Sequence, residues 1–259
     1  MTSAMEGPFR IGTRASLLAM WQANHVADLL RPHAGMQSVE LVQIETTGDV
    51  VQDRPLSAMG GFGVFTHALQ DALLQNRIDL AVHSLKDLPT IPVPGLKLAC
   101  VLAREVTGDA FVSEKHASFD DLPSGAVIGT SSLRRRAMIL SRRPDLTLID
   151  LRGNVDTRLR KLRDQNLDGI ILAEAGLKRL GLAARITEVL DAAWMLPAVG
   201  QGAIGIEIRT SDIRTEHLVT RVNDLPTWRA ITAERTMLAA LGGGCLVPIG
   251  VTTDRKSVV

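Results

Sequence analysis

Short apolar runs alternate with helix-like segments along most of this chain, and that alternation constrains the fold more than any other feature. The runs predicted as strands are 9–12, 39–45, 79–83, 96–102, 110–112, 126–129, 146–151, 169–173 and 203–208. Helices are predicted at 17–30 and 226–241, and helical spacing of apolar residues also follows several other runs. Such repeats predict an α/β fold with mostly parallel sheets and right-handed crossovers.

A length of 259 residues suits two or three domains. Polar loops and a Pro/Gly linker at 196–202 mark the expected boundaries. We expect the first domain to comprise 1–103 and 200–220, because the strand at 203–208 returns to it. The second domain is predicted at 104–199 and the third at 221–259.

Composition argues against several classes of function. The net charge is +1, Tyr is absent and aromatic residues make up 3% of the chain, which disfavours binding to nucleic acid. Residues 1–8 lack the apolar core of a signal peptide, and no apolar run reaches the length of a membrane span. Two distant cysteines suit a reducing compartment, so we expect a cytoplasmic protein without a membrane partner.

Polar residues stand where two predicted strands end. Arg14 lies in a strand-to-helix turn, with Ser16 as a possible helix cap, and Ser84, Lys86 and Asp87 follow the buried run 79–83. Ligands bind at the carboxyl ends of strands in open α/β sheets. A surface ion pair would also explain Lys86 and Asp87. We interpret His83, by contrast, as a packed, hydrogen-bonded core residue.

A second pattern of this kind favours anions. Hydroxyl residues 130–132 precede a helix with arginines in its first turns, Arg152 and Gly153 precede a second, and Lys178 and Arg179 lie on a third. Arginines in a first turn oppose the helix dipole, and a bound anion would explain them. The alternatives are a solvated charged face or a nucleic-acid site formed by residues 134–136, Arg142 and Arg143.

The glycine-rich stretch 242–250 surrounds Cys245, which is a candidate nucleophile or attachment point. The alternative is a small apolar residue in a tight turn. The following run, 246–251, is predicted as a short edge strand interrupted by Pro248. Cys100 lies within an apolar strand and is interpreted as an inert core thiol. The glycine-containing loop from Thr46 to Gly63 is interpreted as a lid, with an ordinary long connection as the alternative.

Eight stretches together resemble the porphobilinogen deaminase (hydroxymethylbilane synthase) family, in the order in which that family carries them. They are Ile11–Ser16, Thr47–Asp49, His83–Pro89, Gly129–Arg135, Leu151–Val155, Gly176–Gly181, Val199–Ala203 and Gly243–Gly250. Each stretch alone is weak evidence. The set covers nearly the whole chain and is highly specific.

The resemblance implies two type II periplasmic-binding-protein-like α/β domains and a small α+β domain that carries the cysteine. It implies a transferase that joins four porphobilinogen molecules head to tail with loss of ammonia, yielding hydroxymethylbilane for tetrapyrrole biosynthesis. The implied primer is a dipyrromethane cofactor bound through a thioether to Cys245. A monomer without metal or nucleotide is also implied.

The resemblance also assigns roles to individual residues. Asp87 would be the catalytic carboxylate that stabilises a cationic intermediate. The implied cofactor-binding residues are Cys245, Ser84, Lys86, Asp87, Thr130, Ser131, Ser132, Arg134, Arg135, Arg152 and Gly153. The implied substrate-binding residues are Arg14, Ser16, Arg152, Arg158, Arg179 and Gln201.

Three departures from the family pattern keep alternatives open. Ala58 and Phe62 stand where many relatives carry lysine, and Arg136 adds a charge. The third domain is expected to be truncated, since the chain stops soon after the cysteine strand. The alternatives are a non-catalytic two-lobed binding protein for a small carboxylate ligand, or an inactive truncated relative.

Overall fold

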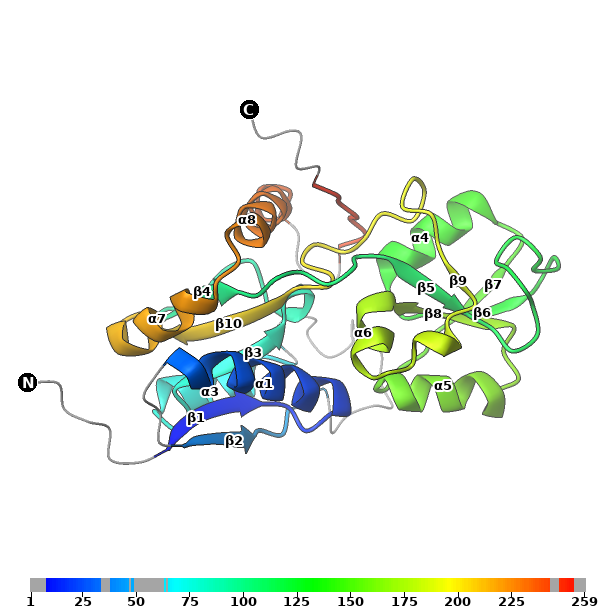
Figure 1. Cartoon of the computed structure of the whole chain (residues 1–259). Coiled ribbons are helices and arrows are strands. Elements are labelled where there is room, and N and C mark those ends of the chain that lie inside the picture. Colours follow the sequence, from blue (N-terminus) through cyan, green and yellow to red (C-terminus); the bar gives the residue numbers. More distant parts are fainter. Residues whose placement is uncertain are drawn as a thin grey trace, which may run out of the picture. The chain divides into compact units, whose positions relative to one another are not determined.

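The computed structural model describes residues 8–33, 38–46, 48, 63, 65–242 and 247–253. The chain forms two compact units (Figure 1). Unit 1 comprises Met1–Val50, Gly63–Arg104 and Ala203–Arg229, and unit 2 comprises Val51–Phe62, Glu105–Gly202 and Ala230–Val259. The division into three domains, with 221–259 as the third, stays a prediction. Among the described helices, none combines the length and hydropathy needed to cross a membrane.

Unit 1 contains a five-stranded sheet in the order β2-β1-β3-β10-β4. Its strands are β1 (Phe9–Thr13), β2 (Val39–Gln43), β3 (Leu80–Ser84), β4 (Leu96–Val101) and β10 (Ile204–Arg209). Strand β1 is parallel to β2 and β3, whereas β10 is antiparallel to β3 and β4. The predicted return of the chain to this sheet is confirmed. The sheet is mixed, but the prediction of a mostly parallel sheet is confirmed, because β1, β2, β3 and β4 run in the same direction and the returning strand β10 runs against them.

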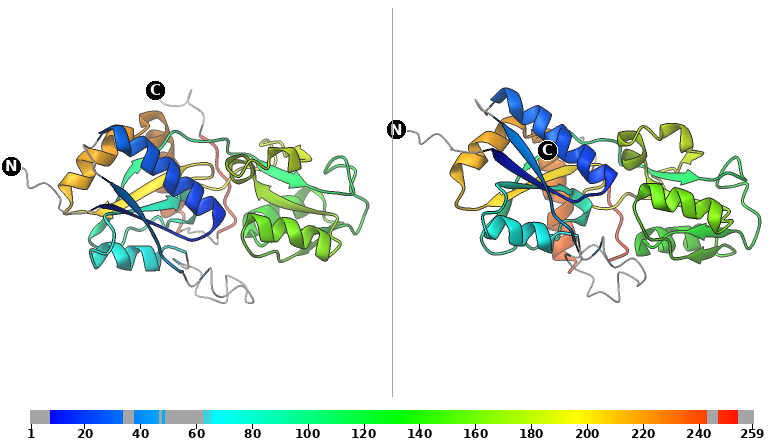
Figure 2. Two further views of the ribbon diagram at one scale, coloured as in Figure 1. Left: turned by 60° about the horizontal axis from the view of Figure 1, so that its bottom comes forward. Right: turned by 90° about the horizontal axis from the view of Figure 1, so that it is seen from below.

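Helices cover both faces of this sheet. On one face, α1 (Leu17–Leu30) and α7 (Ile213–Val219) bury apolar side chains against strand residues such as Leu80 and Val82. On the other face, α3 (His67–Leu74) packs against Ala81. Both views of Figure 2 show α1, in blue, along the sheet. Short 3₁₀ turns occur at Arg31–His33, Leu85–Asp87 and Thr220–Val222.

Unit 2 contains a second five-stranded sheet, in the order β7-β6-β8-β5-β9. Its strands are β5 (Asp109–Val112), β6 (Val127–Gly129), β7 (Thr147–Ile149), β8 (Gly169–Ala173) and β9 (Glu188–Val189). Strand β6 is parallel to β7 and β8, and β5 is antiparallel to β8 and β9. This sheet is therefore also mixed, and the two-residue strand β9 is one that sequence reasoning missed.

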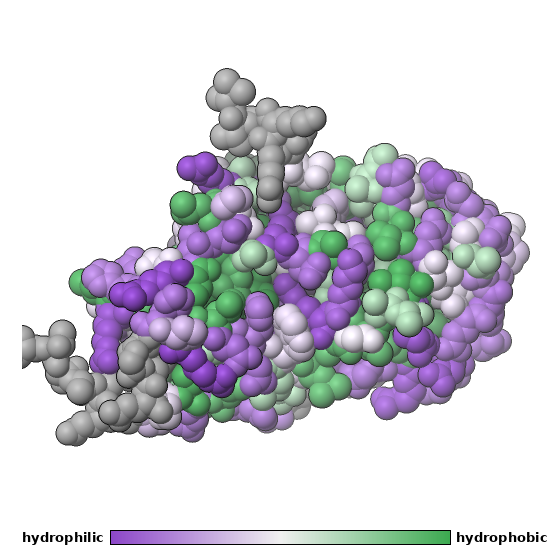
Figure 3. All heavy atoms as spheres, in the orientation of Figure 1, coloured by the Kyte–Doolittle hydropathy of each residue, from purple (hydrophilic) through white to green (hydrophobic). Residues whose placement is uncertain are grey.

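The helices of unit 2 also lie on both faces. Helix α4 (Leu133–Arg142) packs with Phe111 and Ile171, whereas α5 (Val155–Asp164) and α6 (Glu174–Arg179) pack on the opposite face. A 3₁₀ turn follows at Ala183–Arg185. Six of the ten α5 residues are charged, and the surface over α5 is correspondingly hydrophilic in Figure 3.

Helix α8 (Leu225–Ala240) leads toward the glycine-rich stretch, as predicted. The strand predicted at 246–251 is wrong for its described part, because Val247–Val251 forms no strand. Pro248 cannot donate a backbone hydrogen bond. The Val251 amide instead donates to the carbonyl of Pro197 at 2.9 Å.

Candidate functional site

The candidate residues of unit 1 meet at one edge of its sheet. Strands β1 and β3 are parallel and in register, with Ile11 opposite Leu80 and Gly12 opposite Ala81. Their carboxyl ends therefore lie side by side. Arg14 follows the first strand directly, and the second leads through Ser84 into the turn that carries Lys86 and Asp87.

Asp87 ends the 3₁₀ turn Leu85–Asp87 and is half-buried. Leu85 of the same turn is buried, and its amide donates to the Ala203 carbonyl at 3.0 Å, which ties the turn to the start of β10. Within the described part of the chain, no hydrogen bond or ion pair reaches the Asp87 carboxylate. A carboxylate held on a fixed turn without a partner can act on a bound cation.

Two neighbours of this edge are residues that sequence reasoning missed. Gln22, buried on α1, exchanges two hydrogen bonds with the Ser84 hydroxyl at 3.0 and 3.1 Å, which fixes that hydroxyl. The Arg14 guanidinium lies 4.2 Å from the centre of the Phe65 ring, a cation–π contact. Neither partner carries a local sequence signal, since Gln22 is brought in by the packing of α1 and Phe65 by the turn before α3.

Ser16 has a structural role at this edge. Its hydroxyl accepts a hydrogen bond from the Ala19 amide at 3.3 Å and caps α1. His83 is the packed core residue that was predicted, because its Nε2 lies 2.9 Å from the buried Glu207 carboxylate. Gln70 donates to the other Glu207 oxygen at 3.0 Å, so this polar group belongs to the interior beneath α3.

The three hydroxyls before α4 all make hydrogen bonds within unit 2. Ser132 caps α4 by accepting from the Arg135 amide at 3.4 Å, and Ser131 accepts from the Leu151 amide at 2.9 Å. Thr130 is buried and accepts from the Ser132 amide at 3.3 Å. These bonds fix the conformation of the turn between β6 and α4 and thereby orient the first turn of α4.

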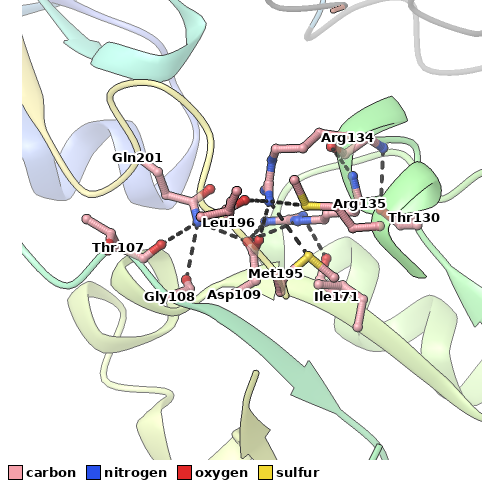
Figure 4. A network of polar contacts seen from close by, with 12 residues as sticks. Thr107, Gly108, Asp109, Thr130, Arg134, Arg135, Ile171, Met195, Leu196 and Gln201 are labelled. Carbon is pink, nitrogen blue, oxygen red and sulfur yellow. Dashed lines mark hydrogen bonds and ion pairs between the residues drawn. The ribbon is translucent and has the colours of Figure 1, made fainter. Parts of the chain in front are cut away.

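Arg134 and Arg135, in that first turn, converge on one buried carboxylate (Figure 4). Nη2 and Nε of Arg135 donate to Asp109 Oδ1 at 2.6 and 3.0 Å, and its Nη1 donates to the Ile171 carbonyl at 2.8 Å. Nη1 of Arg134 forms an ion pair with Asp109 Oδ2 at 2.7 Å without hydrogen-bond geometry. The same Nη1 donates to the Leu196 carbonyl.

Asp109 corrects the sequence interpretation of these arginines. Burial alone would raise the pKa of Asp109, but the charges of Arg135 and Arg134, both in close contact with its oxygens, outweigh that effect and lower the pKa to about 2. The carboxylate therefore stays ionised and offsets the unfavourable dipole interaction. A ligand anion is not needed to explain cations in the first turn of α4.

The cluster nevertheless retains positive charge. Two guanidinium groups face a single carboxylate, and burial lowers the pKa of Arg134 although Asp109 opposes that shift. Among the described residues, Nε of Arg134 is buried and finds no hydrogen-bond acceptor. A buried donor without an acceptor is costly, so this cluster fits a ligand with carboxylate groups.

A second group of cations follows β7. Gly153 has a φ of 115°, in the region that favours glycine, and a Cβ there would stand 2.6 Å from Thr157 Cγ2. Its carbonyl accepts from Nε of Arg158 at 2.7 Å, and the Arg152 carbonyl accepts from Lys161 at 3.0 Å. Both arginine side chains are half-buried at the carboxyl end of a parallel strand.

Arg179 and Gln201 complete the candidate set. Arg179 on α6 donates to the Gly202 carbonyl at 2.8 Å, and burial lowers its pKa although Glu105 opposes that shift. The amide nitrogen of Gln201 donates to the Thr107 carbonyl at 2.7 Å and to Asp109 Oδ1 at 2.9 Å. Gln201 is buried, and these bonds point to a supporting role.

Some predicted features cannot be placed. Cys245, Ala58 and Phe62 lie outside the described residues, as do most of the residues interpreted as a lid. Cys100 is fully buried, and burial raises the pKa of its thiol to about 12, which agrees with an inert core role. The described residues contain no cluster of three or more His, Cys, Asp or Glu side chains suited to a metal ion.

Solved structures with a similar fold include periplasmic binding proteins. The methionine-binding protein MetQ superposes with a TM-score of 0.53 at 14% identity, covering 95% of this chain and 98% of that chain. A periplasmic substrate-binding protein of a Coxiella burnetii ABC transporter also gives 0.53 at 14% identity, covering 90% and 98%. Identities this low show the fold alone, here of the type II periplasmic-binding-protein kind.

Sequence comparisons identify the family. The model of the porphobilinogen deaminase dipyrromethane cofactor-binding domain matches residues 9–217, and the model of the C-terminal domain of porphobilinogen deaminase matches 228–258. Porphobilinogen deaminase of Acidithiobacillus ferrooxidans is 54% identical over 95% of this chain and 80% of its own length. That of Syntrophotalea carbinolica is 53% identical over 93% and 76%. The chain belongs to the porphobilinogen deaminase family.

Proposed function

We propose that this protein is a hydroxymethylbilane synthase. It polymerises four porphobilinogen molecules head to tail, releases one ammonia at each condensation and yields hydroxymethylbilane for tetrapyrrole biosynthesis. The observation that carries this proposal is the Asp87 carboxylate. It is half-buried at the carboxyl end of β3 and, within the described chain, has no hydrogen bond or ion pair.

Asp87 is the proposed catalytic residue. When ammonia leaves porphobilinogen, the remaining pyrrole carries a positive charge. A fixed carboxylate beside that charge stabilises it more than reorienting water would, because no reorganisation is needed as the charge develops. Pyrrole N–H groups are donors that the same carboxylate can accept. Lys86 and Ser84, on the same strand end, hold the negatively charged side chains of the bound pyrroles.

The arginines of unit 2 are proposed to bind carboxylates. Each porphobilinogen carries an acetate and a propionate, so a growing chain accumulates negative charge. Bidentate guanidinium groups match carboxylates in both geometry and charge. The proposed ligands of the cofactor carboxylates are Thr130, Ser131, Ser132, Arg134, Arg135, Arg152 and Gly153. The proposed ligands of the substrate are Arg14, Ser16, Arg152, Arg158, Arg179 and Gln201.

The donor set of unit 2 fits the dipyrromethane cofactor of the family, since Arg134 has a buried Nε without an acceptor among the described residues. Cys245 is the proposed attachment point. When bound, the cofactor supplies a covalently held primer whose free end accepts the first substrate pyrrole. Attachment makes each coupling effectively intramolecular at one end, which lowers its entropic cost.

We also propose that the protein acts in the cytoplasm as a monomer. The sequence favours a reducing compartment, and the family resemblance favours a monomer. The binding-protein alternative is less well supported, because similarity to periplasmic binding proteins is limited to the fold at 14% identity. Identity to porphobilinogen deaminases is 54% and extends over 95% of the chain.

The test is the intact mass of the purified protein before and after addition of porphobilinogen. We expect excess mass equal to a dipyrromethane, followed by a ladder of added pyrrole units. Asp87→Asn keeps the shape of the side chain but removes its charge, so it should keep the cofactor and lose the ladder. A ladder that forms at the normal rate in Asp87→Asn would overturn the role of Asp87.

The cysteines provide matched variants for the same measurement. Cys245→Ser should lack the thioether-linked primer, whereas Cys100→Ala should keep it, because Cys100 is buried in the core of unit 1. The bare sequence mass in the wild-type protein, with no ladder, would contradict the proposed function as a whole.

A further inference from the structure

The segment Leu196–Gly202 accepts hydrogen bonds from two of the candidate arginines of unit 2. Its first carbonyl, from Leu196, accepts from Arg134, and its last, from Gly202, accepts from Arg179 at 2.8 Å. Between them, the Gln201 side chain donates to Asp109 Oδ1 at 2.9 Å. Figure 4 shows Leu196 and Gln201 next to each other beside the Asp109 cluster.

The same segment also holds the stretch that follows Cys245 in the chain. The Val251 amide donates to the Pro197 carbonyl at 2.9 Å. Buried Glu234 links the two stretches as well, since it accepts from the Gly200 amide at 2.9 Å and from the Thr253 hydroxyl at 3.1 Å. The stretch Val247–Thr253 is therefore linked to Leu196–Gly202 directly through Val251 and indirectly through Glu234.

Gly250 lies close against Leu196, at another point where the two stretches meet. A Cβ at this position would stand 2.6 Å from Met138 Cε and 2.7 Å from both Cβ and the carbonyl oxygen of Leu196. Gly250 is not among the glycines with positive φ, so its need for glycine comes from space rather than from backbone conformation. The carbonyl that such a Cβ would displace is the one that accepts from Arg134.

We propose that Leu196–Gly202 is a common support that positions both Val247–Thr253, the described stretch after Cys245, and the Arg134–Asp109–Arg135 cluster, with Gly250 as a positioning residue that acts through Leu196. Attachment of the primer and binding of its carboxylates then depend on one segment of chain. This inference rests on the proposed roles of Cys245 and Arg134.

The first test is a double-mutant cycle between Gly250→Ala and Arg134→Lys, read out as KM for porphobilinogen and as the fraction of protein that carries cofactor. Gly250→Ala should raise KM about five- to tenfold in the wild-type background, because it disturbs the acceptor of Arg134. In the Arg134→Lys background the same change should raise KM less than about twofold. Equal effects in both backgrounds would contradict the proposal.

Gly125→Ala is the matched control. Gly125 has a φ of 81° and open space around its Cβ position, so alanine there strains the backbone without touching Leu196. Its effect on KM should be the same in the wild-type and the Arg134→Lys backgrounds, which separates loss of stability from loss of positioning. Thr253→Val, which removes the hydroxyl bond to Glu234, is a second variant should Gly250→Ala fail to fold.

Hydrogen exchange measured by mass spectrometry tests the support without any turnover. In Gly250→Ala or Thr253→Val, the amides of Gly200 and Gln201 should exchange faster than in the wild-type protein, whereas Gly125→Ala should leave them unchanged. Unchanged exchange at Gly200 and Gln201 in both variants would overturn the proposal. A failure of the proposed function would instead appear as absence of cofactor mass in the wild-type protein.

Discussion

Asp109 has no exposed surface and lies between two guanidinium groups, so the free energy of unfolding should depend on its ionisation. Its folded pKa is about 2, below the ordinary value of 3.8. A lowered folded pKa stabilises the native state at all pH values above the ordinary one. That stabilisation is lost as the pH falls from about 4 toward 2, because the unfolded state then takes up the proton more readily.

The prediction concerns the difference in unfolding free energy between the wild-type protein and Asp109→Asn. Above pH 4, where the wild-type carboxylate is ionised, Asn leaves two buried guanidinium groups without a counter-charge and should cost about 3 kcal/mol. Toward pH 2, the difference should shrink by about 2 kcal/mol as the wild-type carboxylate becomes protonated. Urea unfolding measured at several pH values would show this change, and a difference independent of pH would contradict it.

Asp145→Asn is the control for this pH series. Asp145 is exposed and pairs with Arg143 at 2.7 Å, and the hydrogen bond from that arginine lowers the pKa of Asp145. Salt screens an exposed pair more strongly than a buried one. High salt should therefore remove most of the pH dependence that Asp145 contributes and leave that of Asp109.

Residue types at strand ends were predictable, whereas the partners of those residues were not. Arg134 and Arg135 stand out in sequence because cations oppose the dipole in the first turn of a helix. Their partner, Asp109, lies 26 residues before Arg135 and reaches both arginines only because β5 and β6 both pair with β8. Sequence spacing cannot reveal that order of strands. The sequence therefore indicated a bound anion, whereas the counter-charge is the carboxylate of Asp109.

At the scale of elements, Ser16 combines two roles that can be separated by substitution. It caps α1 through its hydroxyl and is also a proposed substrate ligand. Asn and Asp both cap helices as well as Ser does, but only Asp adds a negative charge. That charge interacts favourably with the N-terminus of α1 and unfavourably with a substrate carboxylate.

We therefore expect Ser16→Asp and Ser16→Asn to keep the wild-type unfolding free energy within about 0.5 kcal/mol, whereas Ser16→Ala should lose about 1 kcal/mol. KM for porphobilinogen should rise more in Ser16→Asp than in Ser16→Asn, with kcat little changed. Steady-state kinetics and thermal unfolding of the three variants provide the measurement. Equal KM values for Asp and Asn would remove Ser16 from the substrate site.

Elements set by local signals were predicted closely. Helix α1 begins and ends as predicted, since Ser16 caps it and apolar residues follow at helical spacing. The predicted strand after the cysteine was wrong, because Val251 bonds to Pro197 rather than to a strand. The apolar run alone cannot show whether a neighbouring strand exists. Helix α7 (Ile213–Val219) was also missed, although Asp212 caps it through the Thr215 amide at 3.0 Å.

At the scale of the whole molecule, residues 105–202 interrupt what would otherwise be a β-hairpin. Strands β4 and β10 are antiparallel neighbours, with Val101 opposite Gly205, and the Leu102 amide donates to the Ile204 carbonyl at 3.1 Å. The two points at which the chain leaves and re-enters unit 1 are therefore adjacent. The sequence indicated the return, but not that β10 lies between β3 and β4.

Because these two points are adjacent, we predict that unit 1 folds without residues 105–202. The test variant replaces residues 105–202 with a short glycine-containing loop and ends at Arg229. It keeps all five strands of the sheet and helices α1, α3 and α7. The short loop would join β4 and β10 as a hairpin, which is the usual connection between antiparallel neighbours. We expect cooperative urea unfolding followed by circular dichroism. A variant that ends at Arg104 lacks β10, which leaves β3 and β4 without their shared neighbour, and should not unfold cooperatively. Cooperative unfolding of that shorter variant would contradict the view that β10 completes this sheet. Loss of cooperative unfolding in the longer variant would instead mean that unit 1 depends on residues 105–202 for its stability.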